Sequence, residues 1–197
     1  MTENFSDAEL VQKTLENPDN YALIIDRYEE PILRYIGRML GTSHEEIEEL
    51  AQMVFIKSYR SINGFDVRLK FSSWLYRIAH NLCVDYLRKN SKHQHMSLDA
   101  EDEYSQALIE TIASEDNVSL HLETDEQKKG IQKIIGMLPE KYRTAIILFF
   151  AEEKSYEEIS DILQIPVSTV GTLLSRAKKQ FLALSQEPQF SYLFRYD

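Results

Sequence analysis

Residues 155–170 have the sequence SYEEISDILQIPVSTV, which predicts two short helices joined by a tight turn. Ser155 and Glu158 form a capping box at the start of the first helix, whose apolar residues recur at helical spacing. Pro166 suits the first turn of a second helix, which keeps one apolar stripe as far as Phe181. This pattern is typical of a DNA-binding helix-turn-helix, although an ordinary helical hairpin would share it.

The second helix carries short hydroxyl groups and cations outside its apolar stripe. Side chains of these kinds contact phosphates and base edges in DNA complexes. The candidate DNA-contacting residues of this helix are Ser168, Thr169, Thr172, Ser175, Arg176 and Lys179.

The net charge of −10 is concentrated in one segment. Residues 99–126 hold ten acidic residues and no Lys or Arg, so the rest of the chain is balanced. Residues 66–95 carry six Lys or Arg against two Asp, and the acidic composition therefore does not exclude a nucleic-acid partner. We expect residues 96–126 to form a mobile acidic linker that screens the basic surfaces on either side of it.

Helical periodicity dominates on both sides of this linker, which predicts an all-α fold of two small domains, residues 1–95 and 127–184. Pro31 should kink or break the helix predicted over 21–40, and Ser43 with Glu46 forms a second capping box. Residues 185–197 form an aromatic tail that we expect to pack on the second domain or on a partner. The remaining helices are expected over 7–15, 43–62, 71–89, 127–136 and 140–151.

The helix predicted over 71–89 interleaves aromatic residues with cations. Such a surface suits unstacked single-stranded DNA, because bases stack on aromatic faces while cations follow the phosphates. The alternative is that the aromatic residues, Trp74 above all, belong to the core. The apolar spacing predicts a buried stripe made of Trp74, Leu75, Ile78, Leu82 and Tyr86.

Composition argues against several other classes of protein. Cys83 is the only cysteine, so an intrachain disulfide is impossible. The longest apolar run, residues 145–151, is far shorter than the about 20 residues that cross a bilayer, and the N-terminus lacks the features of a signal peptide. We therefore expect a soluble cytoplasmic protein. His80 and Asp85 share one helix, but the histidines lack partners at metal-ligand spacing, and we expect no enzyme, cofactor or metal site.

Three blocks of sequence together resemble the extracytoplasmic-function sigma factors of bacterial RNA polymerase. They are LAQMVF at 50–55, FSSWLYRIAHN at 71–81 followed by Asp85 and Arg88-Lys89, and the block from Leu138-Pro139 to Lys178. The resemblance implies that the first domain, sigma2, reads and opens the −10 promoter element, and that the second, sigma4, reads the −35 element. It also implies core RNA polymerase as a partner, through the β′ clamp helices and the β flap, and an anti-sigma protein that is often membrane-bound.

The resemblance also implies residue roles. Contacts to the −10 element fall to Lys70, Phe71, Ser72, Trp74, Arg77, His80, Asn81, Arg88 and Lys89. Contacts to core polymerase fall to Glu46, Glu49, Leu50, Gln52, Met53, Phe55 and Ile56.

This chain departs from the family pattern at two places. Met53 stands where the family often has Glu, and Gly171-Thr172-Leu173 stands where many members have a basic residue, a small hydroxyl residue and Arg. We expect base reading to fall to the four hydroxyl residues and phosphate contact to Arg176 and Lys179. Gly171 lowers helix propensity by roughly 1 kcal/mol but would let the backbone approach DNA closely.

Two further hypotheses remain open at this point. The chain could be a helix-turn-helix regulator that binds duplex DNA unaided, with residues 1–95 as a sensor or dimerisation domain, or it could be a helical adaptor. The regulator should protect its DNA site alone, a sigma factor only with core polymerase, and an adaptor not at all.

Overall fold

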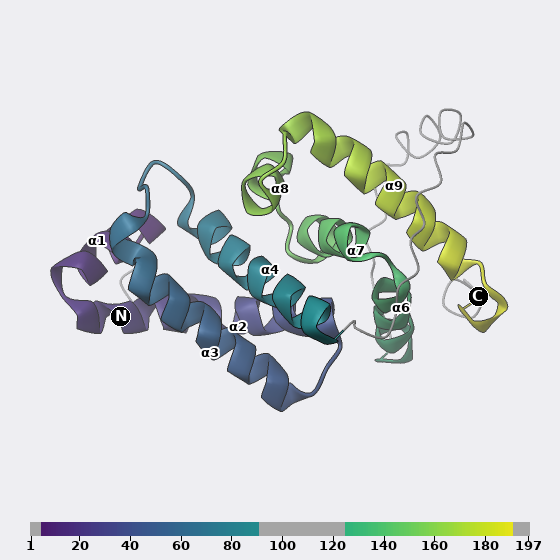
Figure 1. Ribbon diagram of the computed structural model, residues 1–197, viewed down its shortest axis with the longest axis horizontal. Coiled ribbons are helices and arrows are strands. Elements are labelled where there is room, and N and C mark those ends of the chain that lie inside the picture. The colour runs from purple at the N-terminus through teal and green to yellow at the C-terminus, as the bar shows by residue number, and fades with distance from the viewer. Residues whose placement is uncertain (1–4, 91–124, 191–197) are drawn as a thin grey trace.

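The computed structural model describes residues 5–90 and 125–190, and all the regular elements within these ranges are helices (Figure 1). The predicted all-α fold is confirmed, whereas residues 96–124 of the predicted linker and residues 191–197 of the aromatic tail lie outside the described ranges. Two short 3₁₀ turns, η1 (Pro18–Asn20) and η2 (Ile62–Gly64), accompany the longer helices. These are α1 (Asp7–Glu16), α2 (Tyr21–Leu40), α3 (His44–Ser61), α4 (Phe71–Asn90), α6 (Asp125–Met137), α7 (Glu140–Ile146), α8 (Tyr156–Leu163) and α9 (Val167–Ser185).

The N-terminal half is built around α2, which packs against α1, α3 and α4. Ile24, Ile32, Tyr35 and Ile36 of α2 are fully buried. These residues lie on both sides of Pro31, and the helix continues through that proline without a break. Burial of the same face before and after Pro31 holds the helix together, and the expected break does not occur.

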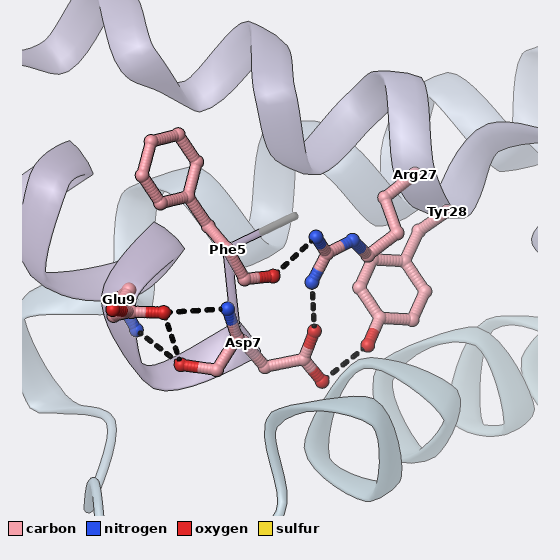
Figure 2. Close-up of polar contacts among 6 residues, drawn as sticks. Phe5, Asp7, Glu9, Arg27 and Tyr28 are labelled. Atoms are coloured by element: carbon pink, nitrogen blue, oxygen red, sulfur yellow. Dashed lines mark hydrogen bonds and ion pairs between the residues drawn. The ribbon is translucent and has the colours of Figure 1, made fainter. Parts of the chain in front are cut away.

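A polar cluster fastens α1 to α2 (Figure 2). The Arg27 guanidinium donates to the Asp7 carboxylate at 2.8 Å and to the Phe5 carbonyl at 2.5 Å. The Tyr28 hydroxyl donates to the other Asp7 oxygen at 2.5 Å. The short first helix is thereby tied to the core by charge-assisted hydrogen bonds as well as by its apolar face.

The predicted capping box at the start of α3 is present and is larger than the sequence indicated. The Ser43 backbone N–H donates to Glu46, and the Ser43 hydroxyl accepts from the Glu46 N–H. The Glu46 carboxylate also accepts from the hydroxyls of Thr42 and Tyr86. These hydrogen bonds, led by that from Thr42, lower the pKa of Glu46 to about 2.

The buried stripe of α4 is rotated from the predicted one. Leu75 and Leu82 are buried as expected, but Trp74, Ile78 and Tyr86 are only partly buried. The difference arises because α4 has neighbours on two sides, with α2 and α3 on one and α8 on another. Its buried surface is therefore shifted and widened relative to the single stripe that the spacing predicted. The buried residues of α4 are Phe71, Ser73, Leu75, Tyr76, Ala79, Leu82 and Cys83.

In the C-terminal half, the helix expected over 140–151 is α-helical only as far as the end of α7. It continues from there as a π-helical segment, η3 (Ile147–Ala151). The Glu152 N–H donates to the Ile147 carbonyl, five residues back, and Glu153 follows with a left-handed φ of 50°. Such wide turns are frequent at functional sites. Of the aromatic tail, Phe190 is described and is buried, with 5% of its surface exposed.

The capping network of Glu46 predicts a specific acid sensitivity. Because the folded pKa lies below the ordinary value of 4.5, the carboxylate contributes stability that is present above about pH 4.5 and is lost as the pH falls towards about 2. Glu46→Gln should lower the stability near neutral pH, and its difference from the native protein should shrink in acid. Urea unfolding followed by circular dichroism at several pH values measures this difference. Glu45→Gln on the same turn is the control, and a difference for Glu46→Gln that does not vary with pH would contradict the assignment.

Candidate nucleic-acid interface

Helices α8 and α9 form the predicted helix-turn-helix. The Ser155–Glu158 capping box starts α8, and Gln164 ends it in a left-handed conformation with φ 56°. The Ser160 hydroxyl donates to the Ile165 carbonyl at 2.6 Å, which fixes the turn before Pro166. These local interactions join the two helices as the sequence indicated.

The outer face of α9 carries the residues predicted to contact DNA. Val170, Leu174 and Ala177 are buried on the opposite face, which packs against α7. Ser175 and Lys179 are partly buried at the edge of this outer face. The fully exposed candidates are Ser168, Thr169, Thr172 and Arg176.

Gly171 does not lie on the outer face of α9. A Cβ atom at this position would meet Cε2 of Tyr156, in α8, at 3.6 Å. That distance is an ordinary van der Waals contact, so the position faces the partner helix. The expectation that Gly171 lets the backbone approach DNA is therefore not supported by its place in the fold.

The candidates for −10 contact lie on or next to α4, but not all of them reach the surface. Lys70, Asn81, Arg88 and Lys89 are exposed, while Ser72, Trp74, Arg77 and His80 are partly buried. Phe71 is buried, with 3% of its surface exposed, and its contact with DNA stays a prediction. Its ring supports that of Trp74, with the centroids 5.4 Å apart.

His80 lies in surroundings that disfavour its charged form. Burial lowers its pKa to about 4, so the imidazole is neutral at physiological pH. Its Nδ1 lies 3.4 Å from the Tyr35 hydroxyl. His80 therefore contributes no charge to the basic surface of α4.

The predicted polymerase-binding residues of α3 divide in the same way. Glu49, Gln52, Met53 and Ile56 are exposed, the last two by 44% and 49%. Glu46 is engaged in its capping network. Leu50 and Phe55 are buried, with 8% and 7% of their surface exposed, and their contact with polymerase stays a prediction. Both side chains belong to the core and pack beneath the exposed face of α3.

An apolar groove continues this surface between α2 and α3. It is lined by Tyr21, Ala22 and Ile25 of α2 and by Ile56 and Tyr59 of α3. The sequence analysis missed Tyr59, which is 43% exposed. Its spacing of three residues from Ile56, and of six from Met53, is the signal that could have identified it.

The two halves are joined at the C-terminal end of α2, where the last carbonyl groups of a helix lack partners within it. Gln132 of α6 donates to the Arg38 carbonyl at 2.8 Å, and Arg143 of α7 donates to the Met39 carbonyl at 2.9 Å. Arg143 also donates to the carbonyls of Gly136 and Leu138. Its burial lowers its pKa. These contacts were not predicted.

A second junction joins α2 and α4 to the segment after η3. The Glu152 side chain, 5% exposed, accepts from Arg38 at 2.5 Å and from the Tyr76 hydroxyl at 2.7 Å. The Lys154 ammonium lies 4.4 Å from the centroid of the same Tyr76 ring. Burial and the neighbouring Glu152 charge raise the pKa of Tyr76.

No helix in residues 5–90 and 125–190 is long and apolar enough to cross a membrane. Within those same ranges, no three His, Cys, Asp or Glu side chains are grouped so as to hold a metal ion.

Comparison with known proteins gives consistent matches in both halves. Residues 24–93 match the sigma-70 region 2 family and residues 128–181 match the sigma-70 region 4 family. The chain is 43% identical over 169 residues to the ECF RNA polymerase sigma factor SigW of Bacillus subtilis, covering 82% of this chain and 86% of SigW. It is 31% identical over 184 residues to the sigma-E factor of Haemophilus influenzae, covering 91% and 95% of the two chains.

The chain belongs to the extracytoplasmic-function sigma factors. It is a non-enzymatic subunit that directs transcription initiation with RNA polymerase. This identification sets aside the unaided regulator, the adaptor and the enzyme.

Solved structures show the same fold. CnrH, in complex with the cytosolic domain of CnrY, superposes with a TM-score of 0.66 at 19% identity, covering 92% of this chain and 98% of the CnrH chain. The sigma factor RpoE of Bartonella quintana, in complex with the anti-sigma factor NepR, gives 0.60 at 17% identity, covering 86% and 98%.

The position of Gly171 predicts that alanine is tolerated there. Gly171→Ala should raise the free energy of unfolding by roughly 0.5–1 kcal/mol, because alanine has the higher helix propensity and Cβ has room beside Tyr156. Thermal unfolding measures the gain. Gly64→Ala, at a glycine with open space but outside the long helices, is the comparison. A lower melting temperature for Gly171→Ala would show that the helix pair is packed more tightly than the structure indicates.

Proposed function

We propose that this sigma factor binds core polymerase through the exposed face of α3 and recognises two promoter elements, the −35 element with α9 and the −10 element with α4. It assists melting at the second. The observation that carries the proposal is that exposed residues suited to each task lie on three different helices, α3, α4 and α9. Figure 1 shows where these helices lie. One chain can then contact polymerase and both elements once the faces are accessible.

The support for −35 recognition is the chemistry of the outer face of α9. Ser168, Thr169 and Thr172 offer hydroxyl groups near the N-terminal end of the helix, where a recognition helix contacts base edges. Arg176 is exposed two turns later, suited to phosphate contact.

The support for −10 recognition comes from α4 and the residue before it. Lys70 lies immediately before the helix, and Trp74 presents a partly exposed ring held by Phe65 and Phe71. Asn81 is exposed and offers both a donor and an acceptor for a base. Cations and an aromatic ring on one surface suit a single strand that has left the duplex.

The support for polymerase binding is the mixed character of the α3 face. Met53 and Ile56 supply exposed apolar area, while Glu49 and Gln52 surround it with polar groups. An apolar centre with a polar rim is the usual anatomy of a protein interface. The β′ clamp helices are the proposed partner of this face, and the β flap is the proposed partner of the second domain.

Control by an anti-sigma protein is proposed from the relatives. RpoE of Bartonella quintana was solved in complex with the anti-sigma factor NepR, and CnrH was solved in complex with the cytosolic domain of CnrY. We propose that this chain works in the cytoplasm and is held there by an anti-sigma protein, anchored in the membrane.

Run-off transcription tests the proposed function. The purified chain is added to core polymerase with genomic fragments as templates, and start sites are mapped. Specific starts that need both chain and core, with shared elements near −35 and −10, are expected. Site protection by the chain alone, without starts in the presence of core, would overturn the proposal.

Asn81 is expected to act in melting. Asn81→Ala should reduce permanganate reactivity of thymines near −10 in the holoenzyme complex, because a base loses its hydrogen-bonding partner. Protection of the −35 element should persist. Asn90→Ala, at the exposed end of the same helix, is the control. Unchanged thymine reactivity in the Asn81 variant would remove this residue from the site.

Arg176 is expected to contact a phosphate. Arg176→Ala should weaken holoenzyme binding to all promoters alike and reduce the slope of log K against log salt by about one unit. Lys133→Ala, an exposed cation on α6, should leave the slope unchanged. A loss confined to one base position, at an unchanged slope, would show that Arg176 reads sequence.

A further inference from the structure

We propose that α8 covers the single-strand-binding surface of α4 in the free chain, its acidic residues occupying the place that the promoter strand takes in the initiation complex. This inference rests on the −10 site proposed above. It adds that the chain itself contains the group that competes with DNA for that site.

The first observation is the place of the contact. Helix α8 packs directly against α4, and α4 lies between α8 and α3 (Figure 1). The residues of α4 and its entry that line the contact include Lys70, Trp74 and Arg77. These are the same side chains assigned to the −10 strand, so α8 and that strand exclude one another.

The second observation is the charge of the covering helix. Helix α8 has the sequence YEEISDIL and contains three acidic residues and no Lys or Arg. Glu158 lies 3.3 Å from the Lys70 ammonium, and Asp161 lines the gap beside Trp74 and Arg77. The Glu158 carboxylate faces Lys70 as a phosphate of the promoter strand would on the same surface.

The third observation is a packing defect at the contact. A gap of about 170 Å³ remains between the two helices, bounded by residues of both. The buried Ser73 hydroxyl, which lines this gap, has no hydrogen-bond partner within the described residues. A permanent core interface leaves few such defects, whereas contacts between domains that separate tolerate them.

The junction at Glu152 places α8 over α4. Arg38 and Tyr76 hold the Glu152 carboxylate just before the turn that leads into α8. Helix α3, by contrast, lies on the other side of α4 from α8 (Figure 1). Core polymerase can therefore bind the exposed face of α3 while α8 still covers the −10 surface of α4.

The test uses the full chain without polymerase and its single tryptophan, Trp74, as the reporter. Glu158→Gln removes the charge facing Lys70 but keeps a side chain that completes the capping box. Acrylamide quenching of Trp74 should increase, and a fluorescein-labelled single-stranded 20-mer of mixed sequence should bind roughly twofold to fivefold more tightly at low salt. Glu157→Gln, on the same helix, changes the net charge equally and is the matched control.

A double-mutant cycle provides the second arm. Lys70→Gln alone should increase the quenching of Trp74 about as much as Glu158→Gln does, and combining the two changes should add little, because either one already breaks the pair. Equal effects of Glu157→Gln and Glu158→Gln on DNA binding, or additive effects of Lys70→Gln and Glu158→Gln on the quenching, would overturn the proposal. Run-off transcription by the unaltered chain is scored separately. Its failure would sink the proposed function while the quenching result still decided whether α8 covers α4.

Discussion

The buried carboxylate of Glu152 is the interaction on which the arrangement of the two halves depends. An almost fully buried charge is tolerated only when it is paired and hydrogen-bonded, and Arg38 and Tyr76 satisfy both requirements from two helices of the other half. The π-helical segment before it turns the chain at this point, and α8 follows directly. Removing one partner would leave an uncompensated buried charge. The Glu152 carboxylate is therefore buried only while both partners are in place.

Much of this fold could be predicted because its signals are local. The capping boxes at Ser43 and Ser155 each depend on a residue three positions away, and both are present. It was harder to predict which residues around each helix are buried. Phe71 and Phe55 belong to the core, although the family resemblance placed them among the contact residues. Periodicity gives the existence of a buried stripe, but the number of neighbouring helices sets its width.

Contacts between the halves could not be read from the sequence at all. Arg38 and Glu152 are separated by 114 positions, and nothing in the residues near either one indicates the other. Arg143 lies in a block that was recognised, yet its role as donor to the end of α2 became visible only in the structure. The candidate surfaces were therefore predicted as separate faces, while the way in which one covers another is a property of tertiary packing.

The covered surface of α4 has a consequence for where the free protein resides in a cell. A genome presents on the order of 10⁶–10⁹ competing non-specific sites, and a chain with every cationic surface open would be titrated onto them. Because Lys70 is paired with Glu158, part of the electrostatic attraction of the chain to DNA is already satisfied within the protein. If α8 covers α4 as proposed, the free chain adsorbs less strongly to random DNA than its cations alone would imply, and a larger share of it is available to bind core polymerase.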